Sequence, residues 1–315
     1  MEQATALLRG GDVVALPTET VYGLAADASK PDAVQKIFAI KGRPATNPLI
    51  VHVASLEMAR SCASEWPSIA EKLAAAFWPG PLTLVLPKSP IMPNIVTAGG
   101  RTVGVRWPSH EVIQAVIRRC HFPLAAPSAN RSGAVSPTTA EHVQRSLGDQ
   151  IPLIVDGGPA EHGIESTVLD VSVSPPQLLR PGVIHIESLA AVVGLVRGPG
   201  LESSGPVRSP GMMLKHYAPK ARVLLWRPEE SLATLLARTK ASPERACVLA
   251  RTRLTLEGMS GQVSAMPKTP DLFGRALYAE LHRCDLTDAE LIIIEAVPDT
   301  VEWQAVADRL RRAAA

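Results

Sequence analysis

The stretch KGRPATNPLIVHV, residues 41–53, indicates how the first half of the chain folds. The residues before it, from Pro31 onward, have the spacing of a helix, and its last five residues, LIVHV, form an apolar run typical of a strand. Pro44 and Pro48 lie between the two segments, and proline marks loops and segment edges. A helix that leads through a short loop into an apolar strand is typical of an α/β domain.

The same alternation of segments continues to about residue 180. The expected strands are VVAL (13–16), LIVHV (49–53), LTLVL (82–86), TVGVR (102–106), PLAAP (123–127), PLIVD (152–156), STVLDV (166–171) and QLLR (177–180). Helices are expected up to Arg9, after Pro31, near 67–77, near 110–119 and from Ser136 onward. This pattern predicts an α/β domain with one large twisted sheet.

The stretch GPGLESSGPVRSPG, residues 198–211, interrupts the pattern with crowded glycine, proline and serine, as linkers do. We therefore predict a domain at 1–197, a flexible linker at 198–220 and a smaller domain at 221–315. The smaller domain has three apolar strands, RVLLW, ACVLA and LIIIEAV, with helices near 229–239, 271–283 and 300–313, which predicts a Rossmann-like parallel unit. GxGxxG and Walker motifs are missing, so a nucleotide would be bound in another way.

Charge and cysteine usage narrow the class of protein. The 315 residues carry a formal net charge of +2, with 15 Lys and Arg against 16 Asp and Glu up to residue 187 and 17 against 14 beyond it. Neither half has the basic excess of a nucleic-acid platform. No apolar run approaches the roughly 20 residues that span a bilayer, and the N-terminus lacks a signal pattern. The separated cysteines fit a reducing, cytoplasmic location: Cys62, Cys120, Cys247 and Cys284.

Polar, loop-forming blocks lie at the expected strand ends, where open α/β sheets bind their ligands. They are LPTETVYGLAAD (16–27), KGRPATNPLIVHV, FWPGPLTLVL (77–86), RTVGVRWPSH (101–110), APSANRSGAVSPTT (126–139), DGGPAEHGIESTV (156–168), LLRPG (178–182) and SPGMMLKHYAPKA (209–221). In this order they resemble the YrdC-like family, specifically L-threonylcarbamoyladenylate synthases in their long, two-domain form. The resemblance implies a twisted mixed sheet with helices around a concave crevice, followed by a Rossmann-like domain.

The resemblance also implies a reaction. Such enzymes join L-threonine and bicarbonate or CO2 to ATP and release pyrophosphate and threonylcarbamoyl-AMP. A downstream complex then transfers the threonylcarbamoyl group to the tRNA adenosine next to the anticodon. Because the carbamate oxygen attacks the α-phosphate directly, the protein mainly positions the reactants and neutralises charge. Mg2+ is expected to arrive with ATP, since Glu161 and Glu165 alone are weak support for a protein metal site.

The phosphate side of the reaction needs cations and hydrogen-bond donors. The resemblance implies that Lys41, Arg43, Ser128 and Asn130 are catalytic, and that Lys41, Arg43 and Ser128 also contact ATP. The further ATP-binding positions that it implies are Asn47, Thr102, Ser136, Arg180 and Tyr217. We expect Tyr217, on the linker, to close over the nucleotide. Taken alone, these residue types would also fit ordinary turns and helix ends.

The amino-acid side needs a cation for the carboxylate and small polar groups for the hydroxyl. The positions that the resemblance implies for L-threonine are Thr20, His52, Arg106, Ala126 and Ser166. Arg106 ends the strand TVGVR and fits the carboxylate. A histidine in a strand is often a buried residue that bonds to the backbone, but His52 directly follows the KGR loop. One segment therefore presents phosphate ligands and a substrate ligand to one crevice.

Two alternatives remain open. The first is a tRNA- or double-stranded-RNA-binding module without synthase activity; the balanced charge speaks against it, although a local basic patch would suffice for direct tRNA binding. The second is a carbamoyl-transfer module of the hydrogenase-maturation type, which shares a YrdC-like domain. That module would require zinc-finger segments, and the chain has no C-x2-C motif. The synthase is therefore the favoured interpretation.

Overall fold

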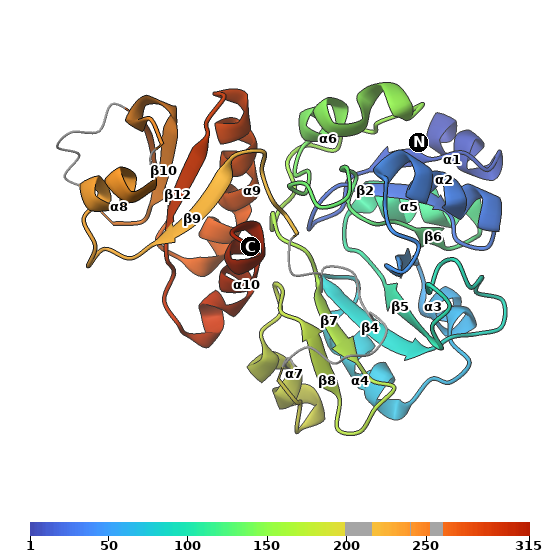
Figure 1. Cartoon of the computed structure of the whole chain (residues 1–315). Coiled ribbons are helices and arrows are strands. Elements are labelled where there is room, and N and C mark those ends of the chain that lie inside the picture. Colours follow the sequence, from blue (N-terminus) through green and yellow to red (C-terminus); the bar gives the residue numbers. More distant parts are fainter. Residues whose placement is uncertain (199–215, 240, 253–260) are drawn as a thin grey trace. The chain divides into compact units, whose positions relative to one another are not determined.

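The structure is a computed structural model that describes residues 1–198, 216–239, 241–252 and 261–315 (Figure 1). The described residues fall into two compact units. Residues 1–132 and 136–198 form the first unit, and the described residues from 216 onward, together with the short segment 133–135, form the second. Most of the expected linker, residues 199–215, lies outside the described residues.

The first unit alternates helices and strands along the chain. Its helices are α1 (Glu2–Arg9), α2 (Pro31–Lys41), α3 (Leu56–Cys62), α4 (Ser68–Phe77), α5 (Glu111–Cys120), α6 (Ala140–Leu147), the short 3-10 helix η1 (Gly148–Gln150) and α7 (Ile186–Val193). Its strands are β1 (Val14–Leu16), β2 (Gly23–Asp27), β3 (Ile50–His52), β4 (Leu82–Pro87), β5 (Thr102–Arg106), β6 (Leu124–Ala125), β7 (Thr167–Asp170) and β8 (Gln177–Arg180). Local signals set the helix ends: Pro31 opens α2, and the Ser55 and Thr139 side chains cap α3 and α6.

These strands form one mixed sheet in the order β1-β2-β6-β3-β5-β4-β7-β8. The pairs β3–β5 and β4–β7 are parallel, and the remaining neighbours are antiparallel. Alternate residues of each strand point to opposite faces, so each face has its own core. One face packs against α2, α4 and α7, with Val51, Val105 and Leu169 among its buried side chains. The other face packs against α1 and α5 along β1, β2 and β6, where Leu16, Ala25 and Leu124 are buried.

The second unit is a small α/β domain around an all-parallel sheet in the order β11-β10-β12-β9. Its strands are β9 (Arg222–Trp226), β10 (Ala246–Ala250), β11 (Gln262–Ala265) and β12 (Leu291–Glu295). Its helices are α8 (Leu232–Thr239), η2 (Pro243–Arg245), α9 (Pro270–Leu286), η3 (Val301–Trp303) and α10 (Gln304–Ala313). Strands β10 and β12 are fully buried, as expected for the centre of a parallel sheet.

The predicted fold class, a large mixed sheet followed by a smaller parallel α/β unit, is confirmed. Several segments differ from the sequence prediction, among them α7, a helix that it did not include. The GLAAD segment forms β2, which its small side chains and lack of β-branched residues concealed. The PLIVD segment is not a strand; within it only Ile154 bridges, to Ala15 of β1. The helix expected from Ser136 begins at Ala140, after the Thr139 cap. The mostly exposed QVSA segment forms the edge strand β11, which the sequence analysis missed.

Candidate active site

A row of polar side chains crosses the large sheet on the face that α1 and α5 cover in part. His52 of β3 is the register partner of Arg106 of β5, which is also the register partner of Thr83 of β4. Thr83 pairs with Val168 of β7, and Val168 pairs with Arg180 of β8. Because register partners point to the same face of a sheet, these positions form one line. We call His52, Arg106, Thr83 and Arg180 the polar row.

Ser166, just before β7, joins the polar row. Its Oγ lies 2.8 Å from Thr83 Oγ1 and accepts a hydrogen bond of 3.1 Å from Arg180 Nη2. Arg180 Nη2 also donates to the Ser166 carbonyl oxygen at 2.9 Å. The structure therefore brings a predicted threonine ligand, Ser166, into contact with a predicted ATP ligand, Arg180.

Gly182 allows the chain after β8 to lie directly against the Ser166 segment. A Cβ atom at residue 182 would be 2.3 Å from Thr167 N and 2.5 Å from the Ser166 carbonyl carbon. Atoms of the backbone cannot yield as a flexible side chain does, so only glycine fits at this position.

The turn of residues 18–21 presents two side chains to the polar row. Thr18 Oγ1 donates to Val21 O at 2.6 Å, which pins the turn. Arg106 Nη1 donates to Thr20 Oγ1 at 2.9 Å, and Arg106 Nη2 lies 2.7 Å from Glu19 Oε1. The side chains of Arg106 and Glu19 are only 5% and 2% exposed, so this is a buried ion pair. Burial raises the pKa of Glu19, but the charge and hydrogen bond of Arg106 outweigh it and hold the pKa below its usual value.

His52 is buried beside this ion pair. Burial, and then the charge of Arg106, lowers the pKa of His52 to about 3, so the imidazole is neutral at ordinary pH. Among the described residues, neither His52 Nδ1 nor Arg106 Nε has a hydrogen-bond partner, although both atoms are buried. Buried polar atoms normally have partners. Such atoms on one row indicate a place that a polar ligand completes.

Lys41 forms a second cationic centre at the end of α2. Its Nζ donates to the carbonyl oxygens of Ser128 (2.6 Å) and Asn130, and approaches Asn130 Oδ1 at 3.5 Å. Three oxygen acceptors match the three N–H bonds of an ammonium group. Burial, and secondly the charge of Arg43, holds the pKa of Lys41 well below its usual value. An anion bound here would raise that pKa, which suits a phosphate site.

The segment with Ser128 and Asn130 is held by the backbones of neighbouring elements. Ala126 N–H donates to Ile50 O of β3 at 3.1 Å, and Ala129 N–H donates to Tyr22 O at 2.8 Å. At its other end, Ser132 N–H donates to Lys41 O at 2.8 Å. The predicted threonine ligand Ala126 therefore lies at the edge of β3, close in sequence to the Lys41 cluster.

Gly42 explains how Lys41 and Arg43 point to different partners. Its φ of 59° is left-handed, as glycine allows, and it ends α2. Arg43 then turns onto its own loop, where Nε donates to Asn47 O at 3.1 Å and Nη2 donates to Pro48 O at 2.8 Å. The structure thus gathers Lys41, Ser128 and Asn130 by direct contact and adds Arg43 through its charge.

Two further predicted ATP ligands lie elsewhere on the first unit. Ser136 Oγ donates to Glu165 Oε1 at 2.7 Å, next to Ser166. Thr102 is on the same face of β5 as Arg106 but at the other end of the strand, opposite Pro87. Four strand residues span about 13 Å. The nucleotide roles of Ser136 and Thr102 stay predictions.

Tyr217 belongs to the second unit and is packed there. Its ring stacks on that of Tyr278 at 5.7 Å between centroids, and the Arg309 guanidinium lies 5.2 Å from its centre. The side chain is 1% exposed. These contacts anchor the segment that carries Tyr217, and its role at the nucleotide stays a prediction.

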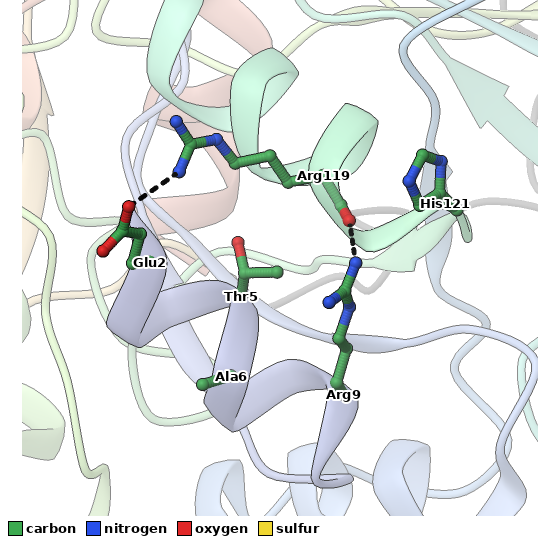
Figure 2. A pocket seen from close by; sticks show the side chains of 6 residues that line it. All are labelled: Glu2, Thr5, Ala6, Arg9, Arg119 and His121. Atoms are coloured by element: carbon green, nitrogen blue, oxygen red, sulfur yellow. Dashed lines mark hydrogen bonds and ion pairs between the residues drawn. The ribbon is translucent and has the colours of Figure 1, made fainter.

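A cavity of about 470 Å3 lies between α1 and α5, away from every predicted site residue (Figure 2). Its charged residues are already engaged: Arg119 Nη1 lies 3.8 Å from Glu2 Oε1, and Arg9 donates to the Arg119 carbonyl oxygen. Helix α5 contributes its carbonyl end to this region, where a helix dipole disfavours anions. This cavity does not suit a phosphate.

Residues 1–198, 216–239, 241–252 and 261–315 contain neither a cluster of metal ligands nor a helix that could span a membrane. In those ranges no three His, Cys, Asp or Glu side chains gather as metal ligands would. No helix in the same ranges has the length and apolar composition needed to cross a bilayer.

The sequence analysis missed two site residues, Glu19 and Thr83. Glu19 sits in the PTETVYGL block between two threonines, but no charge pattern links it to Arg106, 87 positions away. The sequence analysis predicts Thr83 only as part of an apolar strand. Its alternation with Leu82 and Leu84 could have placed it on the opposite face, away from the core.

Comparisons with known proteins identify the family of this chain. Residues 6–182 match the model of the Sua5, YciO and YrdC family, described as "Telomere recombination", and residues 184–315 match "Threonylcarbamoyl-AMP synthase, C-terminal domain". A threonylcarbamoyl-AMP synthase of Pyrococcus abyssi is 41% identical over 98% of this chain and 92% of the relative, and one of Bacillus subtilis is 42% identical over 99% and 92%. The crystal structure of P. abyssi Sua5 complexed with L-threonine superposes with a TM-score of 0.92 at 41% identity, covering 99% of this chain and 93% of that one.

The fold and site thus define an α/β enzyme with a YrdC-like domain. The chain belongs to the threonylcarbamoyl-AMP synthase family, in its two-domain form. The predicted family and the predicted nucleotidyltransferase type of activity are confirmed, and an RNA-binding module without synthase activity is not favoured.

Proposed function

We propose that this chain makes threonylcarbamoyl-AMP and pyrophosphate from L-threonine, bicarbonate or CO2, and ATP. The observation that carries the proposal is the pairing of two distinct cationic centres on one domain. Arg106, with the buried and unpartnered Nε, fits an amino-acid carboxylate, and Lys41, among Ser128 and Asn130, fits phosphate. An amino acid and a nucleotide need such separate anion sites.

The two centres are joined by short stretches of chain. The segment from Thr20 to Gly23 contacts Arg106 at one end, through Thr20, and bridges to Ser128 at the other, through Gly23. Ala126 bonds to Ile50 of β3, two residues before His52 on the same strand. The centres at Arg106 and Lys41 are therefore linked within one domain through the segment from Thr20 to Gly23 and through Ser128. This arrangement favours reaction by positioning.

The chemistry follows from these roles. Threonine binds with its carboxylate at Arg106 and its hydroxyl near Thr20, His52 or Ser166, the polar groups that line the row. Its amine becomes a carbamate, whose oxygen attacks the α-phosphate of ATP and displaces pyrophosphate. Lys41, Arg43 and Arg180 would offset the phosphate charge as it shifts to the leaving group. Mg2+ would come with ATP as part of that substrate.

The wider setting of the reaction is also a proposal. The product would pass to a complex that transfers the threonylcarbamoyl group to the tRNA adenosine next to the anticodon, and a cytoplasmic location fits that acceptor. Tyr217 would contribute to holding the nucleotide. The relatives that are similar over nearly the whole chain, including both units, support a shared activity.

The identity of the product tests this proposal. The purified protein would be incubated with ATP, Mg2+, L-threonine and either normal or carbon-13 bicarbonate, and the nucleotides separated and weighed by mass spectrometry. We expect a threonylcarbamoyl-AMP peak that becomes one mass unit heavier with the labelled carbon. AMP or ADP without such a conjugate would refute the proposal. Lys41→Ala is the variant that tests the phosphate centre in this assay. Its matched control is Lys36→Ala, which changes an exposed lysine paired with Asp12.

A further inference from the structure

A site for a carboxylate alone does not explain why the carboxylate of Glu19 lies in a buried ion pair with Arg106. Arg106 Nη2 and Glu19 Oε1 are 2.7 Å apart, and both side chains are almost fully buried. With His52 neutral, this pair has no net charge. A substrate carboxylate alone would add an unbalanced negative charge to a buried place, which is costly.

An amino acid avoids that cost because it is a zwitterion. Its carboxylate and its α-ammonium group are separated by one carbon atom, as two charges that could face a cation and an anion side by side. Arg106 and Glu19 are such a preformed pair. Exchange of partners, with carboxylate on Arg106 and ammonium on Glu19, keeps the buried charges balanced.

The local structure holds Glu19 in position for this exchange. The neighbouring Thr18 hydroxyl pins the turn through Val21 O, and His162 N–H donates to the Glu19 carbonyl oxygen at 2.8 Å. Arg106 Nη1 donates to Thr20 Oγ1, and Arg106 Nη2 faces Glu19 Oε1 at 2.7 Å as an ion pair. Nε and Nη2 of Arg106 and both carboxylate oxygens of Glu19 have no hydrogen-bond partner among the described residues, so Arg106 can receive a carboxylate and Glu19 can receive an ammonium group.

We propose that Glu19 is the α-amino subsite of the enzyme: it binds the substrate's ammonium group and accepts one proton from it. This inference rests on the proposed function. The ammonium nitrogen gives a proton to the Glu19 carboxylate, which yields a neutral amine and a carboxylic acid. The amine nitrogen then bonds to the carbon of bicarbonate, water leaves, and the carbamate remains; the Glu19 proton returns to solvent.

The electrostatics of the pair suit a base that becomes active when substrate binds. Burial raises the pKa of Glu19, and Arg106 lowers it by charge and hydrogen bond. A substrate carboxylate on Arg106 would share that positive charge and weaken its effect on Glu19. The raising effect of burial would then be opposed less strongly, and the carboxylate would accept a proton more readily.

Binding of two probes by calorimetry tests the proposal without relying on activity. The probes are L-threonine and (2S,3R)-2,3-dihydroxybutanoate, which keeps the carboxylate and β-hydroxyl but has a hydroxyl in place of the amine. For wild-type protein we expect tighter binding of L-threonine. In Glu19→Gln we expect the affinity for L-threonine to fall by about 10- to 150-fold, because a charged hydrogen bond is lost. The dihydroxy acid should bind as well as before or better, because Arg106 loses a competing anion.

Two further variants separate this role from a structural one. Glu19→Asp keeps the charge and should retain part of the preference for the amine. Asp170→Asn removes another buried carboxylate, one that accepts from Ser172 N–H and Oγ–H outside the site, and should leave both affinities unchanged. Thermal unfolding of each variant identifies any that do not fold.

The outcomes distinguish the inference from the proposed function. If Glu19→Gln lowers the affinity for both probes equally, Glu19 only holds Arg106 in place, and the inference is wrong. Unchanged preference for L-threonine in that variant would refute it as well. Wild-type protein that binds neither probe would refute both the inference and the proposed function.

Discussion

His52 and Arg106 are register partners on the parallel strands β3 and β5, and both side chains leave the same face of the sheet. This pairing ties two residues from separate sequence blocks, 54 positions apart, into one site. It also gives His52 its electrostatic character, since burial and the adjacent guanidinium both disfavour the imidazolium form.

His52 should stay neutral throughout the range in which an ordinary histidine titrates. Its pKa is lowered from 6.5 to about 3 in the folded protein. Between these two values the unfolded chain binds more protons, so the free energy of unfolding falls as the pH drops through this window, by up to about 1.4 kcal/mol per pH unit. In His52→Gln this contribution to the slope should vanish. A His52 imidazole signal that titrates near 6.5 in NMR spectra would contradict the account.

The two cationic centres should serve different substrates. Lys41→Ala and Arg43→Ala should chiefly weaken ATP use, whereas Arg106→Ala should chiefly raise the threonine requirement. Each loss of a charged hydrogen bond should cost about 1.5–3 kcal/mol, or roughly 10- to 150-fold in affinity. Calorimetry with each substrate separates the effects.

Stability must be followed in this experiment, because Arg106→Ala leaves the buried carboxylate of Glu19 without its partner. Arg106→Lys keeps the charge but loses the planar fork, and serves as a second variant. Normal L-threonine binding by a folded Arg106→Ala protein would show that its role is misassigned.

Gly182→Ala should disturb the site without touching a ligand. The added methyl group would press against the backbone of Ser166 and Thr167, at 2.5 Å and 2.3 Å. Such overpacking typically costs about 1–3 kcal/mol. We expect a lower unfolding temperature and a weaker response to threonine, because Ser166 moves. Gly198→Ala is the control, since its new Cβ has open space around it; equal behaviour of the two variants would argue against the close approach.

The hydroxyl of Tyr217 should matter more for ATP than for stability. Tyr217→Ala also removes packing against Tyr278 and the Arg309 guanidinium, so it confounds the two effects. Tyr217→Phe keeps the ring and removes only the hydroxyl. We expect several-fold weaker ATP binding with little change in unfolding temperature, on the order of one hydrogen bond. Tyr278→Phe, in the same stack, is the matched control, and unchanged ATP affinity in Tyr217→Phe would show Tyr217 to be an anchor only.

The sequence predicted most strands that have β-branched or large apolar residues, such as β3, β4, β5 and β12, because periodicity and composition are local signals. It missed β2, whose small residues owe their place to burial between β1 and β6. The site residues were identified by resemblance rather than by pattern. Their grouping could not be predicted without the strand order. In the sheet β3 lies directly beside β5, whereas in the sequence β4 lies between them.

Glu19 is a second example of a contact that the local sequence does not predict. Its partner Arg106 lies on β5, and a single carboxylate in a loop gives no local sign of burial or of an ion pair. Sequence reasoning therefore found the cation and missed the anion beside it. Pairs of residues that are distant in the sequence meet only when the strands pair in the correct register, and the local sequence does not show that register.

Pyrophosphate release with one substrate omitted at a time tests the central claim most directly. Purified protein would be assayed with ATP, Mg2+, L-threonine and bicarbonate, and then without each in turn. The account predicts pyrophosphate only in the complete mixture, because the carbamate that attacks ATP exists only when threonine and the carbon source are both present. Equal pyrophosphate release without L-threonine would contradict it.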